Sequence, residues 1–136
     1  MSNLLVQNIK HTNNTTSMTV DSSGQVSVRG EGSATTTNLQ QGLAKTSIRF
    51  SNDQTSVTSS FNISSLTDAA TGQATVNINN DMNDANYSLA EGTIENERET
   101  WIQGSSITSS SYSQRSYNGA NYTDIGGMSQ CFGDLA

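Results

Sequence analysis

Residues 56–79, SVTSSFNISSLTDAATGQATVNIN, contain the clearest strand signal of the chain and largely decide its fold class. In residues 74–79, small apolar side chains alternate with Thr and Asn, which is the period of two expected of a β-strand with one buried face. The apolar run before it carries Val57, Phe61 and Ile63, and TDAATGQ between the two runs supplies turn-forming residues. The stretch therefore predicts a β-hairpin.

Strand patterns continue on both sides of this hairpin. Residues 44–50, AKTSIRF, place Ile48 and Phe50 on one face, whereas residues 79–86, NNDMNDAN, have the composition of a loop. The last part of the chain, from Trp101 onward, supplies three further short strands. About seven short strands separated by turns are typical of an antiparallel sandwich. We therefore expect an all-β fold with a jelly-roll-like β-sandwich over residues 43–136.

The N-terminal part has a pattern of its own. Residues 18–28, MTVDSSGQVSV, are two alternating runs joined by a type I turn from Asp21 to Gly24. Residues 29–42, RGEGSATTTNLQQG, have the composition of a linker. The chain thus divides into an attachment or oligomerisation segment with its linker, residues 1–42, and the sandwich. The apolar residues expected to mediate attachment are Leu4, Val6, Ile9, Met18, Val20, Val26 and Val28.

The composition predicts self-association. Only 32% of the residues are hydrophobic, against about 45–50% in a typical soluble domain counted with Gly. Charged residues make up 13% and Pro is absent, which argues against simple disorder. A chain with so little apolar material gains buried surface by forming oligomers.

Charge and hydropathy exclude some partners. A net charge of -6 and a pI near 4.4 argue against binding to a nucleic-acid backbone. Nothing approaches the roughly 20 apolar residues of a membrane span. The opening MSNLLVQNIK lacks the features of a secretory signal, so synthesis in a cytosol is expected.

Catalytic and metal-binding patterns are weak. His11 is the only histidine, and the single cysteine, Cys131, fits a small buried side chain. Asp81 and Asp84 offer oxygen ligands, but the Gly and Glu positions of a calcium-binding EF-hand loop are missing. We expect neither a metal nor another cofactor.

A group of alternating glutamates is the remaining catalytic candidate. Glu95, Glu97 and Glu99 could supply a carboxylate pair for glycoside hydrolysis, or they could form a charged edge that discourages sheet-to-sheet association. The second interpretation is favoured, and we expect no enzymatic activity.

The segment SYSQRSYNGANYTD, residues 111–124, is the best candidate for ligand binding. Tyrosine combines a flat apolar face with a polar tip, and short polar side chains add adaptable hydrogen bonds, a mixture suited to sugars. A spacing of five sends successive tyrosines to opposite faces of a strand, so at least one is expected in the core. Trp101 is likewise interpreted as a core anchor. The predicted binding residues are Tyr112, Gln114, Arg115, Tyr117, Asn118, Asn121 and Tyr122.

Two long segments resemble a known family. NLLVQNIKHTNNTTSMTVDSSGQVSV, residues 3–28, is similar to the opening of tail fibre and tail fibre-like proteins of marine bacteriophages. GLAKTSIRF and SSFNISSLTDAATGQATVNINNDMNDANYSL are similar to the β-sandwich tip of such proteins, and together the likeness covers residues 3 to about 90.

The resemblance implies a virion structural protein, made in the host cytoplasm and assembled as a homotrimer. Its N-terminal part would attach to the tail or to other virion proteins. Its C-terminal domain would recognise a polysaccharide or outer-membrane receptor on the host. The alternatives are a capsid decoration, cement or baseplate protein without a receptor role and, more weakly, a glycan-degrading enzyme.

Overall fold

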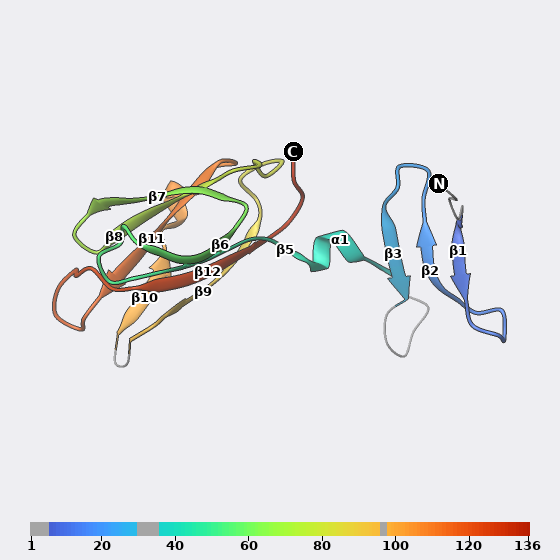
Figure 1. Cartoon of the computed structure of the whole chain (residues 1–136), viewed down its shortest axis with the longest axis horizontal. Coiled ribbons are helices and arrows are strands. Elements are labelled where there is room, and N and C mark those ends of the chain that lie inside the picture. The colour runs from blue at the N-terminus through green and yellow to red at the C-terminus, as the bar shows by residue number, and fades with distance from the viewer. Residues whose placement is uncertain (1–5, 30–35, 96–97) are drawn as a thin grey trace. The chain divides into compact units, whose positions relative to one another are not determined.

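The protein is an all-β chain of two units, which Figure 1 shows as a ribbon. The structure is a computed structural model and describes residues 6–29, 36–95 and 98–136. The two units are Met1–Leu43 and Ala44–Ala136, a division one residue after the predicted boundary. Leu4 and Glu97, for which the sequence predicts roles, lie outside the described residues.

The N-terminal unit is a single antiparallel sheet. Its strands lie in the order β1-β2-β3-β4. In the predicted hairpin, Val20 pairs with Val26, and the Gly24 N–H donates to the Asp21 carbonyl oxygen over 3.0 Å, which confirms the turn. The four strands are β1 (Asn8–Lys10), β2 (Thr16–Val20), β3 (Val26–Arg29) and β4 (Thr36–Asn38).

The expected linker is partly regular structure, which corrects the prediction for residues 29–42. β4 pairs with β3 because backbone pairing needs no apolar side chains, and the register sets Asn38 opposite Ser27. A short helix, α1 (Leu39–Gly42), follows at once. Asn38 joins the two elements, since its Oδ1 accepts the Gln40 N–H over 2.8 Å.

The C-terminal unit is a β-sandwich of two antiparallel sheets, which confirms the predicted fold class. In the β5 sheet the order is β6-β5-β12-β9, and in the β8 sheet it is β10-β11-β8-β7. The β5 sheet consists of β5 (Ala44–Phe50), β6 (Val57–Phe61), β9 (Ser88–Thr93) and β12 (Gly127–Phe132). The β8 sheet consists of β7 (Ile63–Ala70), β8 (Gln73–Ile78), β10 (Glu99–Ile102) and β11 (Ser111–Tyr117). A 3-10 turn, η1 (Gly104–Ser106), lies between β10 and β11.

The core lies between the two sheets. Ile48 and Phe50 of β5 belong to one buried cluster with Val76 of β8 and Tyr112 of β11. Cys131 of β12 is fully buried there, as predicted, and burial raises the pKa of its thiol. The other buried members are Ala74, Ile78, Met82 and Tyr87.

Asn62 divides the run that the sequence presents as one strand. Its φ of 55° lies in the left-handed region, which asparagine tolerates better than most residues. Its Nδ2 donates to the carbonyl oxygens of Lys45 and Asn80, each over 3.1 Å. The chain therefore leaves the β5 sheet after β6 and enters the β8 sheet as β7, so the sandwich has eight strands rather than about seven.

Candidate functional site

Three aromatic side chains meet on the outer face of the β8 sheet. The ring centroids of Trp101 and Tyr117 are 6.5 Å apart, those of Trp101 and Tyr122 are 6.1 Å apart, and those of the two tyrosines are 5.8 Å apart. Tyr122 is 52% exposed, and the other two rings are half-buried. We call these three side chains the aromatic cluster.

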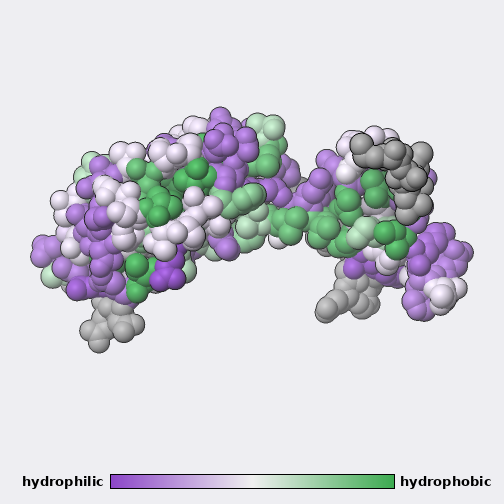
Figure 2. Space-filling model, viewed as in Figure 1, coloured by the Kyte–Doolittle hydropathy of each residue, from purple (hydrophilic) through white to green (hydrophobic). Residues whose placement is uncertain are grey.

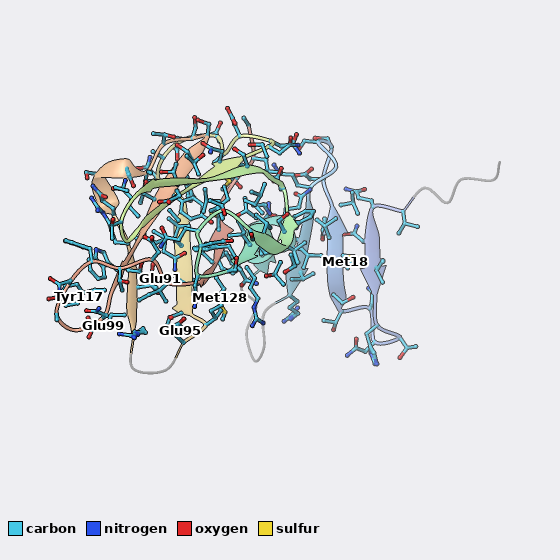
Figure 3. The ribbon with its side chains drawn as sticks, turned by 60° about the vertical axis from the view of Figure 1, so that its left-hand side comes forward. Met18, Glu91, Glu95, Glu99, Tyr117 and Met128 are labelled. Carbon is cyan, nitrogen blue, oxygen red and sulfur yellow. The ribbon has the colours of Figure 1, made fainter. Side chains whose placement is uncertain are left out.

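Strand register brings the first two rings together. Trp101 of β10 lies opposite Arg115 of β11, and Glu99 lies opposite Tyr117. Figure 3 shows Tyr117 beside Glu99 at one end of the sandwich. Because neighbouring residues of a strand point to opposite faces, Ile102 packs against the core while Trp101 faces outward.

A tight turn returns the third ring to the first two. The Asn118 side chain closes the turn by accepting the backbone N–H groups of Ala120 and Asn121 over 3.0 and 2.8 Å. Tyr122 then forms an isolated β-bridge with Tyr117. This bridge places the two rings in edge-to-face contact, a favourable arrangement of aromatic pairs.

Hydrogen bonds to the backbone anchor the loop of residues 118–124. The Gly72 N–H donates to Asp124 Oδ1 over 2.6 Å, and the Ser116 hydroxyl donates to the Thr123 carbonyl oxygen over 2.6 Å. The Ser116 N–H in turn donates to the Gly72 carbonyl oxygen over 3.0 Å. The turn between β7 and β8 thus supports the loop that carries Tyr122, the most exposed ring of the aromatic cluster.

Gln54 supports the same region from the β5–β6 loop. Its side chain is buried, and its Nε2 donates to Ser116 Oγ over 3.1 Å. Asp53 fixes this loop, because its carboxylate accepts the Ser56 hydroxyl over 2.6 Å and the Thr55 N–H over 3.0 Å. These bonds, chiefly that from the Ser56 hydroxyl, hold the pKa of Asp53 well below its usual value. The ionised carboxylate of Asp53 therefore stabilises the conformation of the β5–β6 loop.

Arg115 adds a positive charge to the aromatic cluster. Its Nε donates to Gln103 Oε1 over 2.8 Å, and its guanidinium carbon lies 5.3 Å from the centroid of the Tyr122 ring. This distance is within the range of a cation–π interaction. The surface therefore combines apolar ring faces, tyrosine hydroxyls, an amide and a cation.

The structure separates the predicted binding residues into two groups. Arg115, Tyr117 and Tyr122 come together in the site, and Asn118 and Asn121 form the turn that joins them.

Tyr112 and Gln114 do not belong to the surface, which corrects the prediction for these two residues. They are 0% and 2% exposed, because they point from β11 into the space between the sheets. The Tyr112 hydroxyl lies 2.7 Å from Ser129 Oγ across the sandwich, and burial raises the pKa of that phenol. The expectation that at least one tyrosine is core is confirmed.

Trp101 is a site residue that the sequence interpretation placed in the core. Its neighbour Ile102 occupies the core position instead. Strand alternation over the two residues could have indicated this, since one of two adjacent strand residues must face outward. Gln103 accepts a hydrogen bond from the Arg115 guanidinium, and nothing in the sequence apart from its polar side chain indicates that it belongs to the site.

The other chemical candidates are dispersed. Glu95 forms an ion pair with Arg98 at 3.5 Å and accepts a hydrogen bond from Asn52 Nδ2. Glu99 begins β10, an edge strand, and His11 is exposed in the N-terminal unit. In the part of the chain that the structure describes, no three His, Cys, Asp or Glu side chains gather as a metal site.

The predicted attachment residues share one face of the N-terminal sheet. The register sets Met18 opposite both Ile9 and Val28, and Val20 opposite Val26. The strand residues of the opposite face include Asn8, Thr19, Ser27 and Asn38, which are all polar. Figure 2 shows hydrophobic residues gathered on the visible face of this unit. Val6 precedes β1 and is exposed.

Comparisons of the chain with protein-family models, with curated proteins and with solved structures give no match. Across residues 6–29, 36–95 and 98–136, no helix has the length and apolar character needed to cross a membrane.

Proposed function

We propose that the C-terminal sandwich is a non-catalytic carbohydrate-recognition module and that the aromatic cluster is its binding surface. The observation that carries this proposal is the outward-facing contact of Trp101, Tyr117 and Tyr122 beside Arg115. Protein surfaces seldom gather aromatic side chains without a partner to cover them.

The chemistry of the surface fits a sugar. A pyranose ring presents flat C–H faces edged by hydroxyl groups, and the tyrosine and tryptophan rings provide apolar area with polar tips. Gln103 and the tyrosine hydroxyls supply hydrogen-bonding groups beside the rings. Aromatic and arginine side chains are also the residues that most often dominate binding energy at recognition surfaces.

The resemblance to marine phage tail fibres suggests where this module acts. On that basis we assign the chain to the virion, as a fibre or fibre-tip adhesin that binds a polysaccharide or outer-membrane receptor of the host. The N-terminal sheet would then join the module to the tail or to another virion protein.

Loss of the aromatic cluster is expected to abolish most of the affinity for host glycans. Trp101→Ala and Tyr122→Ala should each weaken binding by about tenfold, equivalent to about 1.4 kcal/mol, since each removes one stacking surface. Binding of the purified protein to host cells and to a glycan array measures the effect. Phe61→Ala is the matched control, because Phe61 is 61% exposed in β6 of the other sheet.

The two variants and the control should remain folded, which far-UV circular dichroism measures. If Trp101→Ala and Phe61→Ala weaken glycan binding equally, the assignment of the site is contradicted. Absence of binding by the wild-type protein to both cells and array would overturn the proposed function.

A second candidate is a structural role in assembly, as a decoration, cement or baseplate protein. The apolar face of the N-terminal sheet favours it, because within the described part of residues 1–43 no second sheet covers Met18, Val20, Val26 and Val28. A sheet of this size normally needs a packed layer on its apolar face. Both candidate functions therefore include self-association through this face, with a homotrimer as the proposed state.

A charge on the apolar face is expected to dissociate the oligomer. Met18→Glu places a carboxylate between the side chains of Ile9 and Val28, where burial against another chain would leave it unpaired. Native mass spectrometry should show trimers for the wild type and monomers for this variant. Thr19→Glu is the control on the polar face and should remain trimeric. A wild-type protein that is monomeric at every concentration would contradict the proposal.

A further inference from the structure

The Arg115 guanidinium is a half-buried charge without an ionic partner in the described part of the chain. The ion pair closest to it in the sequence joins Glu95 and Arg98, and it does not involve Arg115. Within the described residues, the Nε group of Arg115 alone is used in a hydrogen bond, to Gln103. A guanidinium has five N–H donors, so the four on its two terminal nitrogens have no protein acceptor among the described residues. The chain as a whole has a net charge of -6, so Arg115 is a positive site in an acidic protein.

The guanidinium is also held in place. Gln103 fixes its Nε edge, and the ring of Tyr122 lies 5.3 Å away. Trp101 lies opposite Arg115 on the neighbouring strand. A cation restrained in this way loses little conformational freedom on binding, which favours affinity for an anion of matching shape.

A carboxylate has that shape. Arginine binds carboxylates through two parallel N–H···O bonds, which lysine cannot reproduce. A ligand that stacks on the aromatic cluster and carries a carboxylate on its ring would use both features of the surface.

We infer that the sugar recognised by the aromatic cluster is acidic, with its carboxylate bound to Arg115. The class comprises polysaccharides that contain uronic or sialic acids. This inference rests on the proposed carbohydrate recognition and adds the charge of the ligand. Nucleic acids do not fit, because their dense phosphate charge requires several basic residues, whereas among the described residues Arg115 alone places a cation over a ring of the cluster.

The test compares acidic glycans with neutral counterparts of the same linkage. Polygalacturonate, alginate, hyaluronan and polysialic acid are each measured beside a preparation whose carboxyl groups have been reduced to alcohols. A glycan array with neutral and acidic sugars extends the panel. We expect the acidic form of the recognised sugar to bind about tenfold more tightly than its reduced form, and this preference to shrink as ionic strength rises.

Substitution of the arginine assigns the preference to one residue. Arg115→Gln should bring the affinities of the acidic and reduced forms together while the protein unfolds at an unchanged temperature. Arg49→Gln is the matched control, because Arg49 is exposed on β5 of the other sheet and should keep the preference. Arg115→Lys should recover only part of it, since a lysine cannot form the paired bonds.

The outcomes separate the two proposals. Equal binding of acidic and reduced forms by the wild type would overturn the inference and leave carbohydrate recognition intact. A preference that survives in Arg115→Gln would also overturn it. No binding to any sugar of the panel or array would overturn both.

Discussion

Replacement of Gly72 by alanine is expected to lower the free energy of unfolding by about 3 kcal/mol. Gly72 has a φ of 68°, a left-handed conformation that costs other residues roughly 1–2 kcal/mol. A Cβ at this position would lie 2.7 Å from the Ser116 carbonyl oxygen and 2.9 Å from the Thr123 nitrogen. These are backbone atoms in the anchor of the site, so they cannot move aside without breaking it, and overpacking of this kind adds about 1–3 kcal/mol.

Gly119→Ala is the control for backbone strain alone. Gly119 has a φ of 86° but no atom within 4 Å of its would-be Cβ. We therefore expect Gly119→Ala to lower the free energy of unfolding by only about 1 kcal/mol. Chemical denaturation of both variants measures the difference, and glycan binding should fall with Gly72→Ala even where the protein remains folded. Equal stability losses would show that the close contacts at Gly72 are not maintained.

Tyr112→Ala is expected to lower the free energy of unfolding by about 3–5 kcal/mol, which is the usual range when a buried aromatic residue is replaced by alanine. Tyr112 is fully buried, and its hydroxyl connects the two sheets through Ser129. The substitution removes the ring from the centre of the core and leaves the Ser129 hydroxyl without this partner. Thermal and denaturant unfolding, followed by circular dichroism, measure the loss.

Two companion variants separate packing, hydrogen bonding and binding. Tyr112→Phe keeps the ring and loses the hydroxyl with its bond to Ser129, so the free energy of unfolding is expected to fall by about 1–3 kcal/mol. Tyr122→Ala, at the surface, should change stability by no more than about 0.5 kcal/mol. A larger loss of stability for Tyr122→Ala than for Tyr112→Ala would contradict the assignment of one ring to the core and the other to the site.

Alternation of apolar and polar residues was sufficient to predict the fold class. It identified the β7–β8 pair and the β2–β3 hairpin, because apolar and polar side chains alternate in β8, in β2 and in β3 and turn-forming residues join the runs. It failed at Asn62, since a residue in the left-handed conformation looks like any other polar residue within a strand. It also failed for β4, whose pairing depends on backbone groups.

The sequence pattern identified the segment that carries the site but not which of its side chains face outward. In β11 both faces carry polar residues, so the pattern does not reveal whether Tyr112 or Tyr117 points inward. The contact with Trp101 depends on the pairing of β10 with β11. The approach of Tyr122 depends on the anchors at Gly72 and Gln54, which are 50 and 68 positions away from it in the numbering.

The anchors of the loop at residues 118–124 also make it a natural place for diversification. Two hydrogen bonds, from Ser116 to Thr123 and from Gly72 to Asp124, hold one end of the loop. The turn at Asn118 closes its other end. Positions 120 to 122 lie between these fixed points. The hydrogen bonds that hold positions 120 and 121 use their backbone N–H groups, whereas the ring of Tyr122 adds contacts to the aromatic cluster and Arg115. Under the proposed carbohydrate recognition, randomised libraries over this triplet should give altered sugar specificities on an unchanged sandwich.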